Sequence, residues 1–308
     1  MKDALVTIIV ITYNSEKYVL ETLESARDQT YQNIELVIAD DGSTDNTIEI
    51  CRKWLLDNKQ RFLGSKIVTT PVNTGISANC NRGLQASSGD WIKFIAGDDM
   101  LRTHCIRTYI DYIAAHSDCN FLHSKVQKYM EVFSEETIIP KKNTEKLQLN
   151  RNDISAEEQF QILLRFNGVN APSTFISKKV FEIVGNFNEC FKMWEDRPMW
   201  LAITNGGIRL DFMDTITVNY RVHMDSATFY RRPNTIFTDS QIQKEMFLLK
   251  YSRNFGLIER VLKWINFKRK ILFQKIGLNN SSNFAKRLNL LTGFILDYSI
   301  ARINEKYK

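Results

Sequence analysis

The chain has 308 residues, of which 44% are hydrophobic and 25% charged, and its net charge is +6. This composition is that of an ordinary globular protein, and the length suits one large domain with an appendage. The five cysteines form no C-x-x-C pair, which argues against a disulfide framework or zinc site and favours a reducing compartment. We see no signal peptide and no run of about 20 apolar residues, so we expect a cytoplasmic protein.

The charge is unevenly divided along the chain. Residues 1–225 hold 25 Lys and Arg against 30 Asp and Glu, whereas residues 226–308 hold 16 against 5. An acidic body followed by a basic tail indicates two units with different partners. We therefore predict one domain over 1–225 and a basic extension over 226–308.

The first third of the chain alternates strand and helix patterns. Apolar, β-branched runs predict buried strands at 6–13, 34–39, 66–71 and 90–96. Helical patterns lie between them, and Asn14 and Ser15 are expected to cap the first helix, which should begin near Glu16. Strands that alternate with helices predict a parallel α/β sheet.

The middle of the chain is less regular. Residues 140–153 are polar and read as a loop or linker. A capping box at Ser155 and Glu158 predicts a helix over 155–166. We expect a strand and a short helix ended by Gly185 over 173–187, a helix within 193–207, and strands at 121–130 and 217–226.

Each of the first four predicted strands is followed by a polar cluster. The clusters are Thr12-Tyr13-Asn14, Asp40-Asp41-Gly42-Ser43, Asn73 with Gly75, and Gly97-Asp98-Asp99. The carboxyl ends of parallel strands meet at one edge of a sheet, so we expect the clusters to converge on a ligand there. No G-x-G-x-x-G and no P-loop sequence occurs, which excludes those two phosphate-binding motifs.

The adjacent carboxylates of Asp98 and Asp99 need an explanation. Two ionised carboxylates side by side repel each other and are costly to desolvate at the end of an apolar strand. Water in a surface turn, a basic side chain or a divalent metal could offset their charge.

Several blocks of the chain resemble family 2 of the glycosyltransferases. They are VITYNSEKYVLETLESARDQTYQNIELVIADDGSTDNT (10–47), NTGISANCNRGLQASSGDWIKFIAGDD (73–99), VGNFNE (184–189), WEDRPMWLAITNGG (194–207) and YRVHMDS (220–226). The resemblance implies the GT-A fold, an α/β fold with a Rossmann-like, mainly parallel sheet flanked by helices. It divides the first domain into a nucleotide-binding half over 1–99 and an acceptor-binding half over 100–225.

The resemblance also implies an activity. Such an enzyme, of the hexosyltransferase type, moves a sugar from a nucleotide-diphosphate donor, usually linked to uridine, with inversion at the anomeric carbon. The acceptor expected here is a glycan or lipid-linked saccharide in surface polysaccharide synthesis. The resemblance does not indicate which sugar is moved.

A divalent metal, Mn²⁺ or Mg²⁺, is implied at the carboxylate pair. Asp99 matches the family's metal contact, and Asp98 either shares the metal or contacts the ribose. His223 matches a histidine near the diphosphate or metal, although a lone histidine on a strand also suits a purely structural role. The commonest family pattern has a further carboxylate at the position of Ala96, which leaves a three-carboxylate site in doubt.

The remaining matched positions surround the nucleotide. Asp41 matches the acceptor of a uracil hydrogen bond and Asp40 supports its loop, although either carboxylate could instead cap a helix. Arg221 could pair with phosphate, Tyr13 could equally be a core aromatic, and Gly75 could be needed only for backbone freedom. Matched positions that line the base, the ribose and the nucleotide loop are Thr12, Tyr13, Asn14, Glu16, Asn73, Gly75 and Asn79.

Inverting transfer requires a base that takes the proton of the acceptor hydroxyl. Asp196 matches the family's base and Glu195 would orient the site. An acidic pair favoured by the dipole at a helix start is the alternative. Trp194 and Trp200 could stack on a sugar or pack in the core.

The basic tail allows two interpretations. Residues 258–276 and 284–303 mix cations with large apolar residues at helical spacing, which is typical of peripheral membrane contact, here expected at the inner face of the cell membrane. A helical bundle packed on the catalytic domain is the other interpretation. Nucleic acid is not an expected partner, because the body is acidic and no recognised binding motif occurs.

Two other functions fit part of the pattern. A nucleotidyltransferase of the same fold also uses aspartates at strand ends, but it would carry a glycine-rich phosphate loop that the segment TYNSEKY lacks. A non-catalytic module that binds a nucleotide sugar or a glycan would not need the pair of Glu195 and Asp196.

Overall fold

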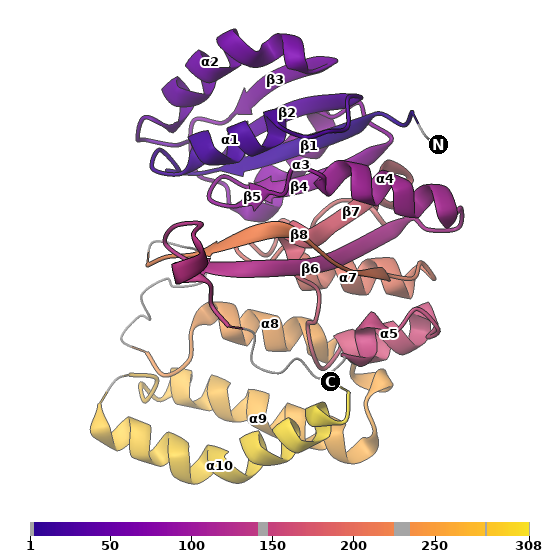
Figure 1. Cartoon of the computed structure of the whole chain (residues 1–308). Helices are drawn as coiled ribbons and strands as arrows, with labels where there is room; N and C mark the ends of the chain where they lie inside the picture. The colour runs from indigo at the N-terminus through magenta and orange to yellow at the C-terminus, as the bar shows by residue number, and fades with distance from the viewer. Residues whose placement is uncertain (1–2, 141–146, 225–234, 281, 308) are drawn as a thin grey trace. The chain divides into compact units, whose positions relative to one another are not determined.

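The computed structural model describes residues 3–140, 147–224, 235–280 and 282–307 (Figure 1). The chain divides into two compact units. The first contains residues 1–160 and 168–224, and the second contains residues 161–167 and 225–308. The predicted boundary at residue 225, part of the predicted linker over 140–153 and the end of the predicted strand over 217–226 lie outside the described residues.

The first unit is built on one mixed sheet, with the order β3-β2-β1-β4-β7-β6-β8-β5 in the described residues. β1, β2, β3 and β4 are parallel, β7 and β5 run antiparallel to their neighbours, and β6 pairs with β8 in parallel. The strands are β1 (Val6–Thr12), β2 (Ile34–Asp40), β3 (Gly64–Thr69), β4 (Trp91–Ala96), β5 (Met100–Leu101), β6 (Phe121–Met130), β7 (Thr174–Ser177) and β8 (Asp211–Val222).

Helices connect these strands. They are α1 (Val19–Arg27), α2 (Thr47–Asn58), α3 (Ile76–Ala86), α4 (Cys105–Ala115), α5 (Ala156–Leu163), α6 (Lys178–Val184) and α7 (Asp196–Asn205), and α5 begins in the first unit and ends in the second. Short 3-10 turns add η1 (Lys59–Arg61), η2 (Glu135–Thr137), η3 (Gln148–Asn150), η4 (Ala171–Ser173) and, in the second unit, η6 (Ser252–Asn254).

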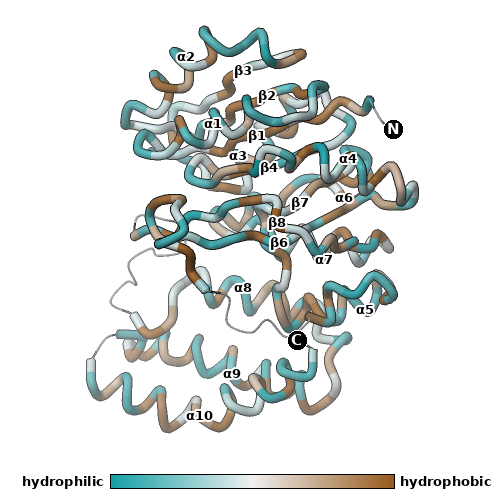
Figure 2. Tube along the Cα trace, in the orientation of Figure 1, coloured by the Kyte–Doolittle hydropathy of each residue, from teal (hydrophilic) through white to brown (hydrophobic). Residues whose placement is uncertain are grey.

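The second unit is helical where it is described. It contains α8 (Asp239–Leu249), α9 (Leu257–Lys275) and α10 (Asn283–Glu305). α9 packs against both α8 and α10. Figure 2 shows hydrophilic and hydrophobic residues alternating along α9 and α10. Across the described residues, no helix combines the length and the apolar composition needed to cross a bilayer.

Both faces of the parallel part of the sheet are covered, which explains why its strands are apolar without alternation. Even-numbered side chains such as Ile8 and Leu36 belong to the core cluster that contains residues of α1, α2 and α4. On the other face, a Cβ on Gly83 of α3 would lie 2.5 Å from Ile9, so the glycine lets this helix approach β1 closely.

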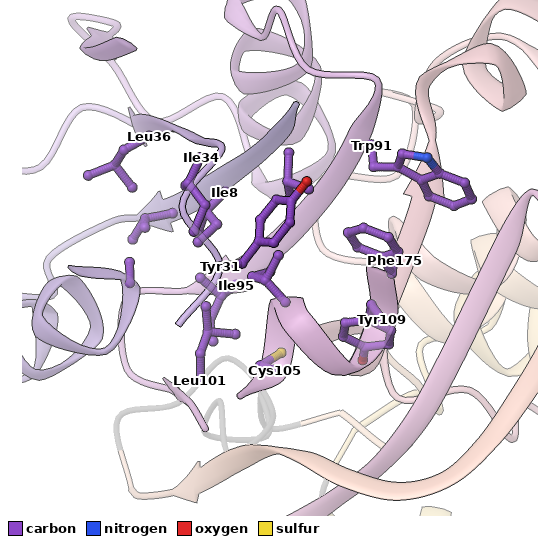
Figure 3. Close-up of a cluster of buried hydrophobic side chains, with 14 of the residues drawn as sticks. Ile8, Tyr31, Ile34, Leu36, Trp91, Ile95, Leu101, Cys105, Tyr109 and Phe175 are labelled. Atoms are coloured by element: carbon purple, nitrogen blue, oxygen red, sulfur yellow. The ribbon is translucent and has the colours of Figure 1, made fainter. Parts of the chain in front are cut away.

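Stacked rings join β4, β7 and α4 in this core (Figure 3). The ring of Phe175 lies between Trp91 and Tyr109, with centroid distances of 4.9 Å to each and interplanar angles of 7° and 12°. This packing fixes β4 against its antiparallel neighbour β7. This contact lies at the start of β4, at the other end of the strand from Asp98 and Asp99.

The start of the first helix differs from its prediction. Residues 16–18 form a turn, and the helix begins at Val19 rather than near Glu16. Asn14 has a left-handed φ of 48°, and the backbone carbonyl of Ser15, not its side chain, accepts hydrogen bonds from the N–H groups of Tyr18 and Val19. The expected capping box at Ser155 and Glu158 is present.

Candidate active site

The ends of β1, β2, β3 and β4 meet at one edge of the sheet. Thr12 pairs with Asp40, which also pairs with Thr69, and Ala96 pairs with Ile11. The polar segments that follow these strands therefore begin side by side. This register brings the predicted nucleotide loops and the carboxylate pair to the same edge.

Asp40 organises the turn after β2. Its carboxylate is fully buried and accepts hydrogen bonds from the Thr12 hydroxyl at 2.9 Å and from the backbone N–H groups of Gly42 at 3.0 Å and Ser43 at 2.9 Å. The Ser43 hydroxyl donates to the same carboxylate. Buried polar groups are stable only when paired in this way, so Asp40 holds the loop.

Asp41 points towards the loop after β3. Its carboxylate accepts hydrogen bonds from the N–H groups of Thr74 at 3.0 Å and Gly75 at 2.7 Å, and from the Thr74 hydroxyl. The Arg82 guanidinium lies 3.5 Å away. The Asp41 side chain is 4% exposed, so in this conformation its oxygens hold the loop rather than face solvent.

The segment after β1 is fixed to the turn after β2. The Asn14 side-chain oxygen accepts from the N–H of Thr44 at 2.8 Å, and the Glu16 carboxylate accepts from the N–H of Asn46 at 3.0 Å. Tyr13 is 47% exposed and is therefore not a core aromatic.

The helix α3 reaches back to the strand ends. The buried side-chain amide of Asn79 donates to the Ala39 carbonyl at 2.8 Å and to the Thr12 carbonyl at 3.3 Å. This contact places the start of α3 beside the ends of β1 and β2. Asn73, in the loop before α3, is exposed.

The carboxylate pair is held by the end of β8. Asp99 accepts a hydrogen bond from the backbone N–H of Arg221 at 2.8 Å. The Arg221 guanidinium donates to the Asp98 carbonyl at 2.8 Å, forms an ion pair with Glu21 at 2.9 Å and also donates to the Glu131 carbonyl. Arg221 is only 2% exposed and thus anchors the turn from within the protein.

His223 contacts the other carboxylate of the pair. Its Nε2 lies 2.9 Å from Asp98 Oδ2, and its ring packs on Tyr18 at a centroid distance of 4.8 Å. The Nδ1 atom of His223 is buried and has no hydrogen-bond partner in the described residues. The Asp98 side chain is 27% exposed, whereas Asp99 is buried.

The positive groups near Asp98 and Asp99 do not fully offset the cost of their charges. Burial, followed by the charge of Asp98, raises the pKa of Asp99 well above its usual range. The N–H and charge of Arg221 and the charge of Lys93 act in the opposite direction but are outweighed. A cation close to the pair would favour the ionised form of Asp99.

The segment that leads into α7 is tied to the start of α3. The Ile76 N–H donates to the Lys192 carbonyl at 2.6 Å, and the Ser77 hydroxyl donates to the Phe191 carbonyl at 2.6 Å. Asn81 exchanges two hydrogen bonds of 2.9 Å with the backbone of Phe187. These contacts tie residues 187–192, which precede the acids at the start of α7, to the helix that follows the predicted nucleotide loops.

Glu195 and Asp196 occupy the N-terminus of α7. Glu195 is the N-cap residue, and Asp196 accepts a hydrogen bond from the Arg197 N–H at 2.6 Å. Burial raises the pKa of Cys80, and the charges of Glu195 and Asp41 raise it further. Glu195 of α7 and Asp41 of the loop after β2 therefore both lie within electrostatic range of the Cys80 thiol on α3.

The family model described as glycosyl transferase family 2 matches residues 7–170, which is more than half of the chain. The chain belongs to glycosyl transferase family 2. The matched range contains all four strand ends and the carboxylate pair, whereas α7 and β8 lie beyond it.

Known proteins extend the comparison. WfaP from Escherichia coli, named as a UDP-Glc:alpha-D-GlcNAc-diphosphoundecaprenol beta-1,3-glucosyltransferase, is 29% identical over 230 residues, which are 73% of this chain and 80% of WfaP. Several other curated glycosyltransferases match about a third of this chain, and the matched regions span less than half of their own length.

Solved structures show the fold of this family 2 member. TarS 1–349 from S. aureus, in complex with UDP-GlcNAc, aligns with a TM-score of 0.62 at 18% identity over 85% of this chain and 71% of that chain. The mannosyltransferase PcManGT from Pyrobaculum calidifontis, in complex with GDP-Man and Mn²⁺, aligns with a TM-score of 0.55 at 16% identity over 81% and 63%. The predicted GT-A fold is confirmed.

The carboxylates of Asp98 and Asp99 in this family 2 chain suit a divalent cation that is coordinated by only a few protein ligands. In the described ranges no three His, Cys, Asp or Glu side chains converge as a cation site. The pair of Asp98 and Asp99 nevertheless offers hard oxygen donors in a position where burial and mutual repulsion outweigh the positive charges of Arg221 and Lys93. Mg²⁺, for example, is often held by one or two carboxylates, with waters and substrate phosphates completing its shell.

The two tryptophans in or near α7 have different surroundings. Trp200 is 1% exposed and contacts Phe121 edge to face at a centroid distance of 5.0 Å, so it belongs to the core. Trp194 is half-buried and packs edge to face on Phe191 at 5.1 Å. Only Trp194 has a surface that could meet a sugar.

Sequence analysis missed several residues that position the site. Arg82 contacts Asp41, Tyr18 donates to the Glu131 carboxylate at 2.8 Å, and the ring of Phe133 covers the Arg221 guanidinium at 4.0 Å. Arg82 lies three residues after Asn79 on α3, and this helical spacing was a usable signal. No local pattern links residues 131–133 to the pair of Asp98 and Asp99.

Proposed function

We propose that this protein transfers a sugar from a UDP-sugar donor to a glycan or lipid-linked saccharide, with inversion, as a step in surface polysaccharide synthesis. The observation that carries the proposal is the pair of Asp98 and Asp99 at the edge where the nucleotide loops converge. WfaP, named for a UDP-Glc donor and a diphosphoundecaprenol acceptor, supports both the donor and the acceptor class.

The nucleotide lies over the ends of β1 and β2 in this proposal. The exposed ring of Tyr13 offers a stacking surface for the base. Asp41 contacts the uracil N–H, which requires one of its oxygens to leave the N–H of Thr74 or Gly75. Thr12, Asn14, Glu16, Asp40, Asn73 and Asn79 shape or support this pocket.

The diphosphate lies at the pair of Asp98 and Asp99, which would hold Mn²⁺ or Mg²⁺ with help from His223. The cation supplies positive charge that stabilises the departing diphosphate. Asp99 is oriented for this role by the Arg221 N–H and Asp98 by His223. Because its guanidinium is occupied by Glu21 and two carbonyls, Arg221 acts by positioning the turn.

Asp196 acts as the base. As the acceptor hydroxyl oxygen bonds to the anomeric carbon, its proton passes to the Asp196 carboxylate and the bond to the diphosphate oxygen breaks, which releases UDP. Glu195 orients the acceptor. The contacts of Ser77 and Asn81 with residues 187–191, just before the two acids, support this arrangement.

Calorimetric titration with UDP, with and without Mn²⁺, tests the donor site. We expect UDP to bind and the affinity to fall at least about tenfold when Mn²⁺ is withheld or Asp99 is changed to Asn. GDP and CDP are the controls. Preference for GDP, the nucleotide of the GDP-Man bound in the PcManGT complex, would keep the transferase but remove the role of Asp41. Failure of all three nucleotides to bind would contradict the proposal.

Asp196→Asn tests the base separately. This change should lower turnover with a UDP-sugar by at least about a hundredfold, because general base catalysis contributes about 10²–10⁴. UDP affinity should stay within about twofold, since the residue acts on the acceptor. Undiminished turnover would show that another group takes the proton.

A further inference from the structure

The surfaces of α9 and α10 are unusually apolar. In the described part of the chain, 25 large hydrophobic side chains are exposed, and thirteen of them lie between Leu257 and Tyr298. Scattered single apolar residues are normal on a protein surface, but a dense group marks an interaction site.

The outer face of α10 is the clearest part of this surface. Leu291 is 80% exposed, Phe294 68%, Ile295 72% and Tyr298 54%. Spacings of three and four residues place these side chains on one side of the helix. Phe284 and Leu290 extend the same face.

The opposite side of α10 is fixed on α9. A Cβ on Gly293 would overlap the Arg269 guanidinium, which donates to the Asn289 side chain at 2.8 Å. Asn266 of α9 also bonds to Asp297 at 3.1 Å. These polar contacts set the rotation of α10, so its apolar face cannot turn inwards.

The surface also carries excess positive charge. Residues 257–306 contain ten Lys and Arg, of which seven are exposed, but only three Asp and Glu. Two of the three acids are already paired, Glu259 with Arg165 at 2.7 Å and Asp297 with Arg269 at 3.4 Å. The remaining excess complements a negatively charged partner.

The mixture of residues on α9 favours lipid over protein. Val261, Trp264, Ile265 and Leu272 are exposed on the same side as Lys268. Lysine is depleted from protein–protein interfaces. Lysine stems and tryptophan rings instead suit a bilayer surface, where apolar parts enter the acyl boundary and polar ends stay among headgroups.

An open groove of about 620 Å³ lies between α9 and α10. Its lining includes the apolar Ile258, Leu262 and Ile303, the cations Arg302 and Lys306 and the anion Glu305. The groove thus adds apolar surface to the faces of α9 and α10, with a net excess of one cation.

We propose that the exposed faces of α9 and α10 bind the surface of an anionic lipid bilayer. Because neither helix is apolar enough to span a membrane, they lie in the interface plane, with apolar side chains among the acyl chains and cations among the headgroups. This inference does not depend on the proposed sugar transfer, although a lipid-linked acceptor would give the contact a purpose.

Vesicle flotation with the full chain tests this inference. Vesicles of phosphatidylglycerol and phosphatidylcholine should carry the protein at 50 mM salt, whereas vesicles of pure phosphatidylcholine should carry at least about tenfold less. Binding to the anionic vesicles should fall as salt rises, because the headgroup attraction is screened.

A matched pair of variants locates the contact. Leu291→Gln combined with Phe294→Ser should reduce the bound fraction at least about tenfold, since each side chain loses its apolar burial. Leu56→Gln changes a side chain that is 71% exposed on α2 and should bind as the parent does. All these side chains are exposed, so folding should be preserved, which circular dichroism checks.

Three results would overturn the inference. The first is failure of the parent to float with anionic vesicles at low salt. The second is equal flotation of the double variant and Leu56→Gln. The third is a parent that is oligomeric by light scattering and a double variant that is monomeric, with neither protein bound to vesicles. The apolar face would then join copies of this chain.

Discussion

Replacing Gly75 by alanine should disrupt the link between the nucleotide loop and the segment before α7. Gly75 has φ 100° and ψ 162°, a region that is almost restricted to glycine and costs a residue with a side chain about 1–3 kcal/mol. An added Cβ would also lie 2.7 Å from both the Cβ and the carbonyl oxygen of Lys192. Overpacking of this kind costs a further ~1–3 kcal/mol.

Gly185 provides a matched control. Its φ of 85° and ψ of −177° fall in the same region, but an added Cβ would meet nothing within 4 Å. Gly185→Ala should therefore cost only the backbone term of about 1–3 kcal/mol. The difference between the two variants isolates the collision with Lys192.

The assay is urea unfolding followed by tryptophan fluorescence, with UDP titration on the folded variants. Four of the five tryptophans belong to the first unit, so fluorescence reports mainly on it. We expect the free energy of unfolding to fall by at least about 1 kcal/mol more in Gly75→Ala than in Gly185→Ala. UDP affinity should fall only in Gly75→Ala, because this residue also donates to Asp41. Equal losses in both variants would refute the reasoning.

Three further predictions concern buried groups. Burial lowers the pKa of His123 to about 3, so its neutral form contributes stability above pH 6.5 that is lost as the pH falls towards 3. At pH 5 the free energy of unfolding should be about 2 kcal/mol lower than at pH 8 because of this group. Urea unfolding across this pH range should lose that difference in His123→Leu but keep it when the exposed His104 is changed. Asn81→Ala should destabilise the protein by about 1–3 kcal/mol and lower turnover more than UDP affinity, because residues 187–191 lose their anchor; unchanged turnover would argue against this positioning role. Trp200→Ala should cost about 3–5 kcal/mol in urea unfolding, because Trp200 is a core residue, whereas a loss of sugar-donor affinity without loss of stability would contradict that placement.

The sequence predicted those parts of the fold that local patterns determine. Apolar, β-branched runs gave β1 to within one residue and β6 without error. The glycine at the end of α6 is Gly185, as expected from its conformational freedom. Such patterns depend on neighbours in the chain, which is why they are readable in it.

Features that depend on distant residues were not predictable. The first helix begins late because Asn14 and Glu16 serve the turn at 42–46, not their own helix. β5 has only two residues, too few for a pattern, and exists because β8 pairs with it. The positions of the candidate site residues were expected from strand ends and family resemblance, and their chemical roles stay predictions.

The hydrogen bond from Arg221 to Asp99 has a consequence for synthesis of the chain. Its two residues are 122 positions apart, and β8 is the last of the described strands to leave the ribosome. Contacts of such high sequence separation form late in folding. A nascent chain that ends before β8 has the predicted nucleotide loops but lacks the Arg221 N–H that holds Asp99, so the proposed diphosphate site is complete only when the sheet is complete.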